Sequence, residues 1–215
     1  MTQLKWKKKK WREILAPQSF GSQPVGESFT LDSQDLIGKT ASVNLMHLTK
    51  NPRKQNITVT FKVTGVEQNK GVTKTYSYIM LPASIKRFVR AGRDRIDESF
   101  VVKTKDAQYA RVKPLMISAN TQAAAIRTKI RRQVVTHIRQ LAAKVDFEEF
   151  VKQVVDGKVQ KELKPLLDTI TRLRTFEIRS IQLIENMPVL KLKKLQKEGA
   201  FTQESQEETI SQAEE

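Results

Sequence analysis

The segment ITVTFKV, at residues 57–63, decides the fold because it alternates apolar and polar side chains without interruption. A period of two places its apolar residues, Phe61 among them, on one face of a β-strand and leaves the other face to solvent. Residues 67–71 then supply turn formers, and residues 72–81 resume a β-rich pattern. We therefore predict a β-hairpin over these two runs.

Outward from the hairpin, further strands are expected on both sides. Residues 41–49 have a strand pattern, and residues 99–105 are predicted to pair with residues 109–118 across a turn. Residues 82–90 begin with proline and keep their apolar side chains on one helical face, which indicates a short helix. The segment 40–118 is thus expected to be mainly sheet.

The apolar period changes to 3.6 after residue 120. An apolar stripe through residues 123–141 with a basic opposite side predicts a long amphipathic helix. A second helix is expected to begin at Asp146 with a capping box, and a third to cover residues 158–171. Residues 174–185 return to a strand pattern, with a bulge predicted at Ser180. Strands followed by helices in one chain indicate the α+β class.

The charge of the chain points to a polyanionic partner. Its 215 residues carry a net charge of +16 with a pI near 10.1. Residues 1–12, 86–95 and 121–145 contribute +6, +4 and +6, which together equal the whole net charge. Basic runs are often merely solvated, but three of them in one chain favour the binding of nucleic-acid phosphates.

Length and composition indicate one folded domain at residues 21–190 between two tails. Residues 1–20 form a basic tail, and we expect that removing residues 1–12 would leave the domain folded. Residues 191–215 form an acidic tail, expected to be disordered on its own because it is rich in glutamate and poor in apolar residues.

Enzymatic chemistry is not expected. The chain has no cysteine and only two histidines, His47 in an expected strand and His137 on the long helix, both interpreted as structural. No catalytic motif, phosphate-binding glycine loop, metal-ligand cluster or cofactor motif occurs. Acids such as Asp94, Asp97 and Glu98 stand beside arginines and are expected to pair with them. The lack of cysteine fits a reducing, intracellular setting, and no run of apolar residues is long enough to span a membrane.

Four aromatic residues could contact nucleic acid. Trp6 and Trp11 stand among the N-terminal lysines, where an indole can stack on a base. We interpret Trp11 as a hydrophobic anchor for the tail, and leave stacking and anchoring open for Trp6. Tyr76 and Tyr78 are two residues apart, as in a stacking pair on one strand face, but the same spacing is commoner in a core.

Three motifs carry a family resemblance: KKWREILAPQSF at residues 9–20, GESFTLDSQDL at residues 26–36 and RAGRDRIDESFVVKTKD at residues 90–106. Their order and spacing resemble the small-subunit ribosomal protein S-three-A family of archaea and eukaryotes, over about residues 5–185. The second motif departs from the family pattern at Glu27 and Thr30.

The resemblance implies an antiparallel β-barrel-like sheet domain with packed C-terminal helices and an extended basic N-terminal tail. It further implies a cytoplasmic structural protein of the ribosome, on the platform of the small subunit near the message exit and the rRNA 3′ end. Its partners would be small-subunit rRNA, neighbouring ribosomal proteins and messenger RNA near the exit.

Together, charge and resemblance give a set of candidate residues. The predicted rRNA contacts are Lys5, Trp6, Lys7, Lys8, Lys9, Lys10, Arg12, Lys86, Arg87, Arg90, Arg93, Arg95, Arg127, Lys129, Arg131, Arg132 and Arg139. The predicted docking residues of the tail are Trp11, Pro17 and Phe20. Two other functions stay open: a free binder of single-stranded nucleic acid, and a basic chaperone or interaction protein for acidic partners.

Overall fold

The computed structural model describes residues 8–185. The chain divides into two units, residues 1–183 and 184–215, so almost everything described belongs to the first unit. The acidic tail predicted at residues 191–215 lies outside the described residues, and the predicted domain limits remain predictions. Within residues 8–185, no helix is long and apolar enough to cross a membrane.

The predicted hairpin consists of strand β4, Ile57–Glu67, and strand β5, Lys70–Met80, which pair antiparallel. The two residues of its turn, Gln68 and Asn69, have φ angles of 47° and 66°. A two-residue turn with positive φ at both positions matches the twist of the strands it joins. The hairpin prediction is confirmed.

The other edge of β5 is divided between two strands. At its start, Gly71 and Val72 pair parallel with β1, Lys10–Leu15. Near its end, Ser77–Ile79 pair antiparallel with β9, Leu173–Ile184. A Cβ at Gly71 would stand 3.3 Å from a methyl carbon of Val63, so glycine lets β1 and β4 approach β5 closely here.

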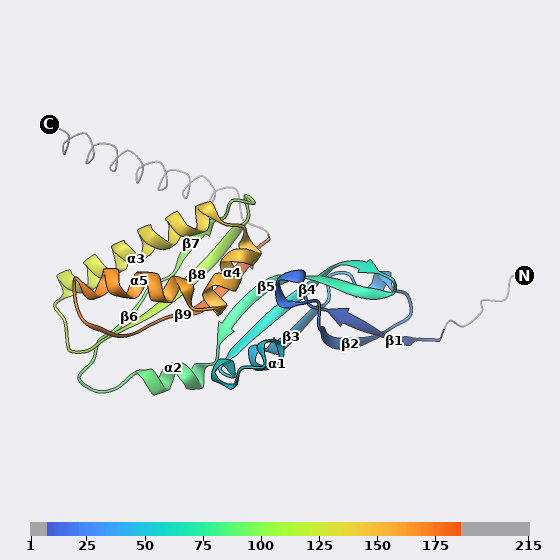
Figure 1. Cartoon of the computed structure of the whole chain (residues 1–215), viewed down its shortest axis with the longest axis horizontal. Coiled ribbons are helices and arrows are strands. Elements are labelled where there is room, and N and C mark those ends of the chain that lie inside the picture. Colours follow the sequence, from blue (N-terminus) through green and yellow to red (C-terminus); the bar gives the residue numbers. More distant parts are fainter. Residues whose placement is uncertain (1–7, 186–215) are drawn as a thin grey trace, which may run out of the picture. The chain divides into compact units, whose positions relative to one another are not determined.

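Nine strands form one sheet in the described part of the chain (Figure 1). Those not yet named are β2 Pro24–Thr30, β3 Thr40–Asn44, β6 Arg95–Asp97, β7 Phe100–Lys103 and β8 Tyr109–Ser118. The main path runs β2-β1-β5-β9-β8-β6, with β4 joining β3 to β5 and β7 pairing with β8. The path ends at β2 on one side and at β6 on the other. The sheet is therefore open and does not close into a barrel.

Within residues 8–185, five helices complete the α+β fold, whose class is confirmed. They are α1 Leu45–Thr49, α2 Pro82–Phe88, α3 Ala124–Lys144, α4 Phe147–Val155 and α5 Lys158–Asp168. Short 3-10 turns lie at η1 Gln18–Phe20, η2 Gln34–Leu36 and η3 Pro52–Lys54. Helix α3 packs along β7 and β6, α4 contacts β5 and η1, and α5 packs against α3 and α4 (Figure 1).

Two local predictions are wrong. The strand expected at 41–49 ends at Asn44, whose side chain accepts a hydrogen bond from the Met46 amide and starts α1, so His47 is helical. Asp146 stands at the N-cap of α4 but caps nothing, because its carboxyl group shares a hydrogen bond with Asp106. The bulge at Ser180 stays a prediction, because Ser180 pairs with Ile79 in regular register while the buried positions of β9 change phase between Ile178 and Ile181.

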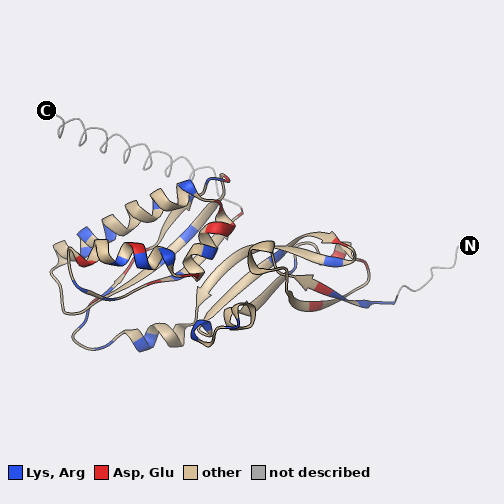
Figure 2. Ribbon diagram, in the orientation of Figure 1, with Lys and Arg blue, Asp and Glu red and all other residues tan. Residues whose placement is uncertain are grey.

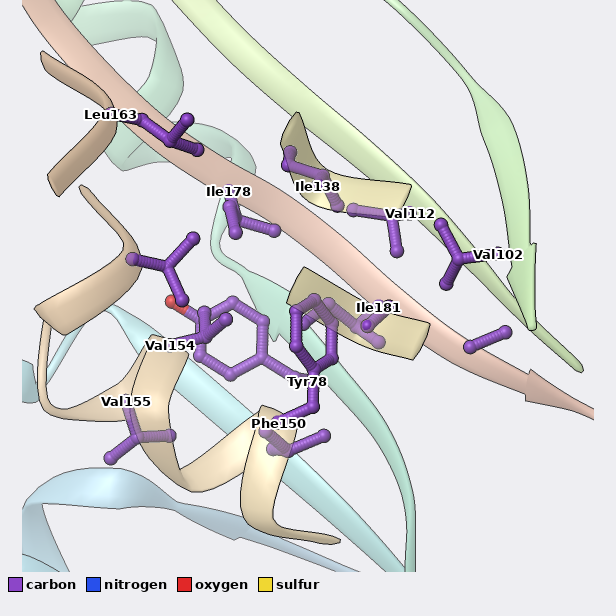
Figure 3. Close-up of a cluster of buried hydrophobic side chains, with 14 of the residues drawn as sticks. Tyr78, Val102, Val112, Ile138, Phe150, Val154, Val155, Leu163, Ile178 and Ile181 are labelled. Carbon is purple, nitrogen blue, oxygen red and sulfur yellow. The ribbon is translucent and has the colours of Figure 1, made fainter. Parts of the chain in front are cut away.

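The largest core cluster joins the sheet to the helices. Figure 3 shows Tyr78 of β5 beside Phe150 and Val154 of α4 and Ile181 of β9. All four are at most 1% exposed. Burial of each such side chain contributes about 1.5–3 kcal/mol, so this cluster holds α4 against the sheet where β5 and β9 pair.

Replacing Phe150→Ala should lower the free energy of unfolding by about 3–5 kcal/mol, because it leaves a cavity between α4 and the sheet. Urea unfolding followed by far-UV circular dichroism measures the change. Leu166→Ala is the matched control, since Leu166 is 46% exposed on α5, and its cost should stay below about 1 kcal/mol. Equal losses in the two variants would contradict this placement of the core.

One acid is held in an unfavourable place beside this core. Glu177, on β9, is partly buried, and this burial raises the pKa of its carboxyl group. A hydrogen bond with the Gln160 side chain partly opposes the rise. The carboxylate also raises the pKa of Tyr78, for which burial is the larger cause. Ionised Glu177 is thus poorly solvated in the folded state.

The raised pKa of Glu177 predicts a sign for its pH dependence. Below its ordinary value of 4.5 the carboxyl group is protonated in both folded and unfolded states, so it adds no penalty. As pH rises above that value the unfolded state ionises first, and folding stability falls. Glu177→Gln should therefore be more stable than the parent at pH 7, and this advantage should vanish near pH 4 in urea titrations.

Candidate nucleic-acid interface

The N-terminal basic segment enters the sheet rather than hanging free of it. Lys8 and Lys9 lead directly into β1, which Lys10 opens, and all three side chains are exposed. Lys5, Trp6 and Lys7 lie outside the described residues. Because β1 starts at Lys10, removing residues 1–12 would delete half of a strand that pairs with both β2 and β5. The tolerance of the domain to this truncation stays a prediction.

Arg12 makes hydrogen bonds to other parts of the protein. Its Nη1 donates to Asn69 Oδ1 in the β4–β5 turn at 2.8 Å, and its Nη2 donates to the Leu31 carbonyl oxygen at 3.2 Å. The Nε atom is buried and has no partner in the described structure. Arg12 therefore ties β1 to the hairpin turn and to the end of β2, and it has little left with which to bind a phosphate.

The three predicted docking residues behave differently. Pro17 is buried, and the Phe20 ring packs edge-on against Phe61 with centroids 5.5 Å apart. Trp11, in contrast, is 67% exposed and contacts Phe29 across the β1–β2 pair. The interpretation of Trp11 as a buried anchor is wrong, because strand alternation turns Ile14 into the structure and Trp11 away from it.

The second basic segment lies on α2 and the loop that follows. Lys86 and Arg87 occupy the last turn of α2, and Arg90 follows it, all exposed. Arg93 is half-buried. None of these four has an acidic partner among the described residues. Arg95, the fifth predicted contact here, opens β6 and pairs with Asp97.

The third basic segment, helix α3, is tied to the second by acids. Asp94 accepts a hydrogen bond from the Gln122 amide at 2.8 Å and lies 3.7 Å from Arg127. Glu98 lies 3.7 Å from Arg131. These contacts join Asp94, in the loop after α2, and Glu98 to the start of α3. In the strand order, β1 is separated from β6 by β5, β9 and β8.

The pairing of acids with arginines, expected from the sequence, is confirmed. Asp97 contacts Arg95 and also lies 3.9 Å from Arg179. Lys129 and Arg132 of α3 are exposed and have no acidic partner in the described part of the chain, whereas Arg139 is half-buried and does interact with another residue. Figure 2 shows that basic residues follow α3 along its length.

Within residues 8–185, no cluster of histidines and acids could hold a metal ion. The site is therefore a set of basic side chains on α2, its following loop and α3, with a separate basic segment at β1. A model of the Ribosomal S3Ae family matches residues 2–187.

The chain belongs to this family.

Proteins similar to it include the small ribosomal subunit protein eS1 of Nanoarchaeum equitans, 32% identical over 178 residues that make up 83% of this chain and 90% of the relative. That of Methanocaldococcus jannaschii is 30% identical over 205 residues, 95% of this chain and 90% of the relative. That of Methanothrix thermoacetophila is 32% identical over 182 residues, 83% and 84% of the two chains.

In this member of the Ribosomal S3Ae family, the two tyrosines do not form a stacking pair. A bulge lies where Thr60 pairs with Ser77 but Phe61 pairs with Thr75, which leaves Tyr76 without a partner on β4. The bulge turns Tyr76 to the face where Lys62 lies 5.8 Å above its ring, while Tyr78 points into the core. The bulge has no signal in the alternation of the sequence.

An acidic cavity was missed in the sequence because its residues come from distant segments. It has a volume of about 590 Å³ and is lined by Asp106, Asp146, Glu148, Glu149 and Asp156, with Lys74, Lys152 and Lys158 among the other residues. The hydrogen bond with Asp106 is the main cause that raises the pKa of Asp146. Its carboxylates would repel phosphates, so this part of the surface is a poor place for RNA.

Arg12→Lys keeps the charge but loses the paired contacts of the guanidinium group. We expect it to lower the free energy of unfolding by about 1 kcal/mol, since its hydrogen bonds are exposed, and to leave the salt dependence of RNA binding unchanged. Urea unfolding and a salt titration measure the two effects. Arg132→Lys is the control, because Arg132 is exposed on α3, and both properties should stay as in the parent. An unchanged free energy of unfolding in the Arg12 variant would contradict the structural role of this residue.

Proposed function

We propose that this protein is a structural constituent of the small ribosomal subunit and binds rRNA through phosphate groups. Membership of the Ribosomal S3Ae family supports the ribosomal role, and relatives are small ribosomal subunit proteins. In this role it catalyses no reaction and works on the cytoplasmic ribosome. Its place near the message exit and the rRNA 3′ end, and any contact with messenger RNA, are part of the proposal.

The observation that carries the phosphate contact is the division of the basic residues. Arg95, Arg127 and Arg131 are paired with acids and hold the structure around β6 and α3. A second set has no acidic partner within residues 8–185 and remains available for phosphates: Lys86, Arg87, Arg90, Arg93, Lys129 and Arg132. The ion pairs thus divide the basic residues into two groups. Members of one group stabilise the structure, and members of the other are proposed to bind phosphates.

The mechanism is the release of counterions. Each lysine or arginine that neutralises an rRNA phosphate frees a condensed cation, so affinity falls steeply as salt increases. Contacts of this kind fix the position and orientation of the protein on RNA without reading its sequence. Specific placement in a subunit then follows from the arrangement of the folded surface.

The triple variant Lys86→Gln, Arg87→Gln and Arg90→Gln tests this mechanism on the full chain. We expect the slope of log affinity against log salt for small-subunit rRNA to decrease in magnitude by about 2 to 3. Lys158→Gln, Lys161→Gln and Lys164→Gln remove the same charge from exposed positions of α5 and should change the slope little. Equal changes in both variants would indicate generic attraction to the net charge.

The two other functions predict different behaviour. A structural constituent should sediment with small subunits in cell extracts and leave that fraction after nuclease treatment. A free binder of single-stranded nucleic acid would not sediment with subunits, and a chaperone for acidic proteins would be insensitive to nuclease. We expect the parent to sediment with subunits and the α2 triple variant to be depleted from them.

A further inference from the structure

The outer face of the β1–β2 pair carries two large aromatic side chains that the fold does not use. Trp11 and Phe29 stand directly opposite each other in the strand register, with ring centroids 5.1 Å apart and an angle of 40° between the rings. They are 67% and 50% exposed. Neither belongs to a core cluster, whereas Ile14 of the same strand is buried with Leu36 and Val63. Two aromatics held together in water suggest a binding surface.

The position of this aromatic pair is fixed by the backbone. Trp11 belongs to β1, which pairs with β2 from Lys10 to Leu15 and with β5 at Ile14 and Leu15. The neighbouring Arg12 points the other way and ties β1 to Asn69 and Leu31. A ligand would therefore meet rings that are already ordered, which reduces the entropy lost on binding.

The charges around the pair select the ligand. Lys8, Lys9 and Lys10 are exposed and have no acidic partner in the part of the chain that the structure describes. Lys9 is two residues from Trp11, the spacing that puts side chains on one face of an extended chain. Lysine is depleted from protein interfaces, whereas aromatic rings beside lysines are typical of surfaces that bind single-stranded nucleic acid.

Two acids on the same face indicate on which side of the aromatic pair a phosphate would lie. Glu13 and Glu27 are opposite each other, on the side of Trp11 away from the lysines. Glu13 is paired with Lys70 at 2.8 Å, so Glu27 is the main repulsive charge. Phosphates would therefore lie toward Lys8–Lys10, with a base over the rings.

We propose that Trp11 and Phe29 form a stacking platform for an unpaired nucleobase, with Lys8, Lys9 and Lys10 neutralising the adjacent phosphates. The platform accepts any base, because stacking uses the ring face that all bases share. The proposal rests on the proposed function in that the natural ligand would be an unpaired nucleotide of rRNA. It differs from the phosphate contacts at α2 and α3, which need no unpaired base.

Tryptophan fluorescence of the full chain tests the platform directly. The chain has two tryptophans, so Trp6→Phe leaves Trp11 as the only indole signal. We expect a single-stranded oligouridine to quench this signal and an RNA duplex of equal length to leave it nearly unchanged. Quenching by both or by neither would overturn the proposal.

Affinity measurements give an independent readout. Trp11→Ala should weaken binding of oligouridine about tenfold, with an unchanged salt slope and an unchanged affinity for duplex. Trp11→Phe should recover part of the loss, and Leu166→Ala, at an exposed apolar position on α5, should have no effect. Lys8→Gln, Lys9→Gln and Lys10→Gln together should instead reduce the slope. Circular dichroism must show that each variant is folded as the parent is.

The outcomes separate this proposal from the function on which it rests. If Trp11→Ala binds oligouridine like the parent while the α2 triple variant loses its salt slope, the platform is wrong and phosphate binding stands. If Trp11→Ala keeps its RNA affinity but fails to enter small subunits, the rings contact a protein, which also overturns the platform. If the α2 triple variant changes nothing while Trp11→Ala binds weakly, the proposed phosphate surface fails and the platform stands.

Discussion

The sheet depends on the way strand β5 uses its two edges. One edge pairs with β4 along the hairpin, and the other is divided between β1 and β9. The backbone N–H and C=O groups along this edge of β5 need hydrogen-bond partners. Neither β1 nor β9 covers the whole edge, so two segments distant in sequence both pair with β5. Gly71 permits the approach of β1, and Tyr78 places an aromatic ring where β9 and α4 meet. Strands 1–4 and strands 6–9 are parts of one sheet for this reason.

Ion pairs likewise determine which charged side chains have a partner within the protein. Three acids that follow α2 would weaken a phosphate site if they had no partners, yet Asp94, Asp97 and Glu98 all contact arginines. Exposed ion pairs contribute little to stability, and their larger effect here is to determine which basic side chains keep an unbalanced charge. The acidic cavity at α4 collects other carboxylates, those of Asp106 and of acids between residues 146 and 156.

Much of the fold follows from the period of the sequence, because the alternation at 57–63 and the 3.6-residue stripe of α3 each reflect burial of one face. The errors arise where local pattern and tertiary contact disagree. A bulge opposite Phe61 reverses the face of Tyr76, and the cap at Asn44 turns apolar residues into a helix. The prediction for Trp11 is wrong because its neighbours are basic on both sides. They form no alternation of apolar and polar residues that would indicate which face of the strand is buried. Which basic residues form ion pairs also depends on contacts between segments that are distant in sequence, and periodicity does not indicate such contacts.

The two faces of β1 then explain how a short strand can serve both folding and binding. Alternation directs Arg12 toward the hairpin turn and Trp11 toward solvent, so neighbouring residues have separate roles. Since β1 is joined through β5, β9 and β8 to β6, a base held at Trp11 and phosphates held near α2 and α3 would be bound by a continuous hydrogen-bonded sheet. RNA segments that contact both surfaces would lose freedom relative to each other. A protein with two such surfaces would thus contribute to an assembly by fixing the distance between the RNA segments bound to them.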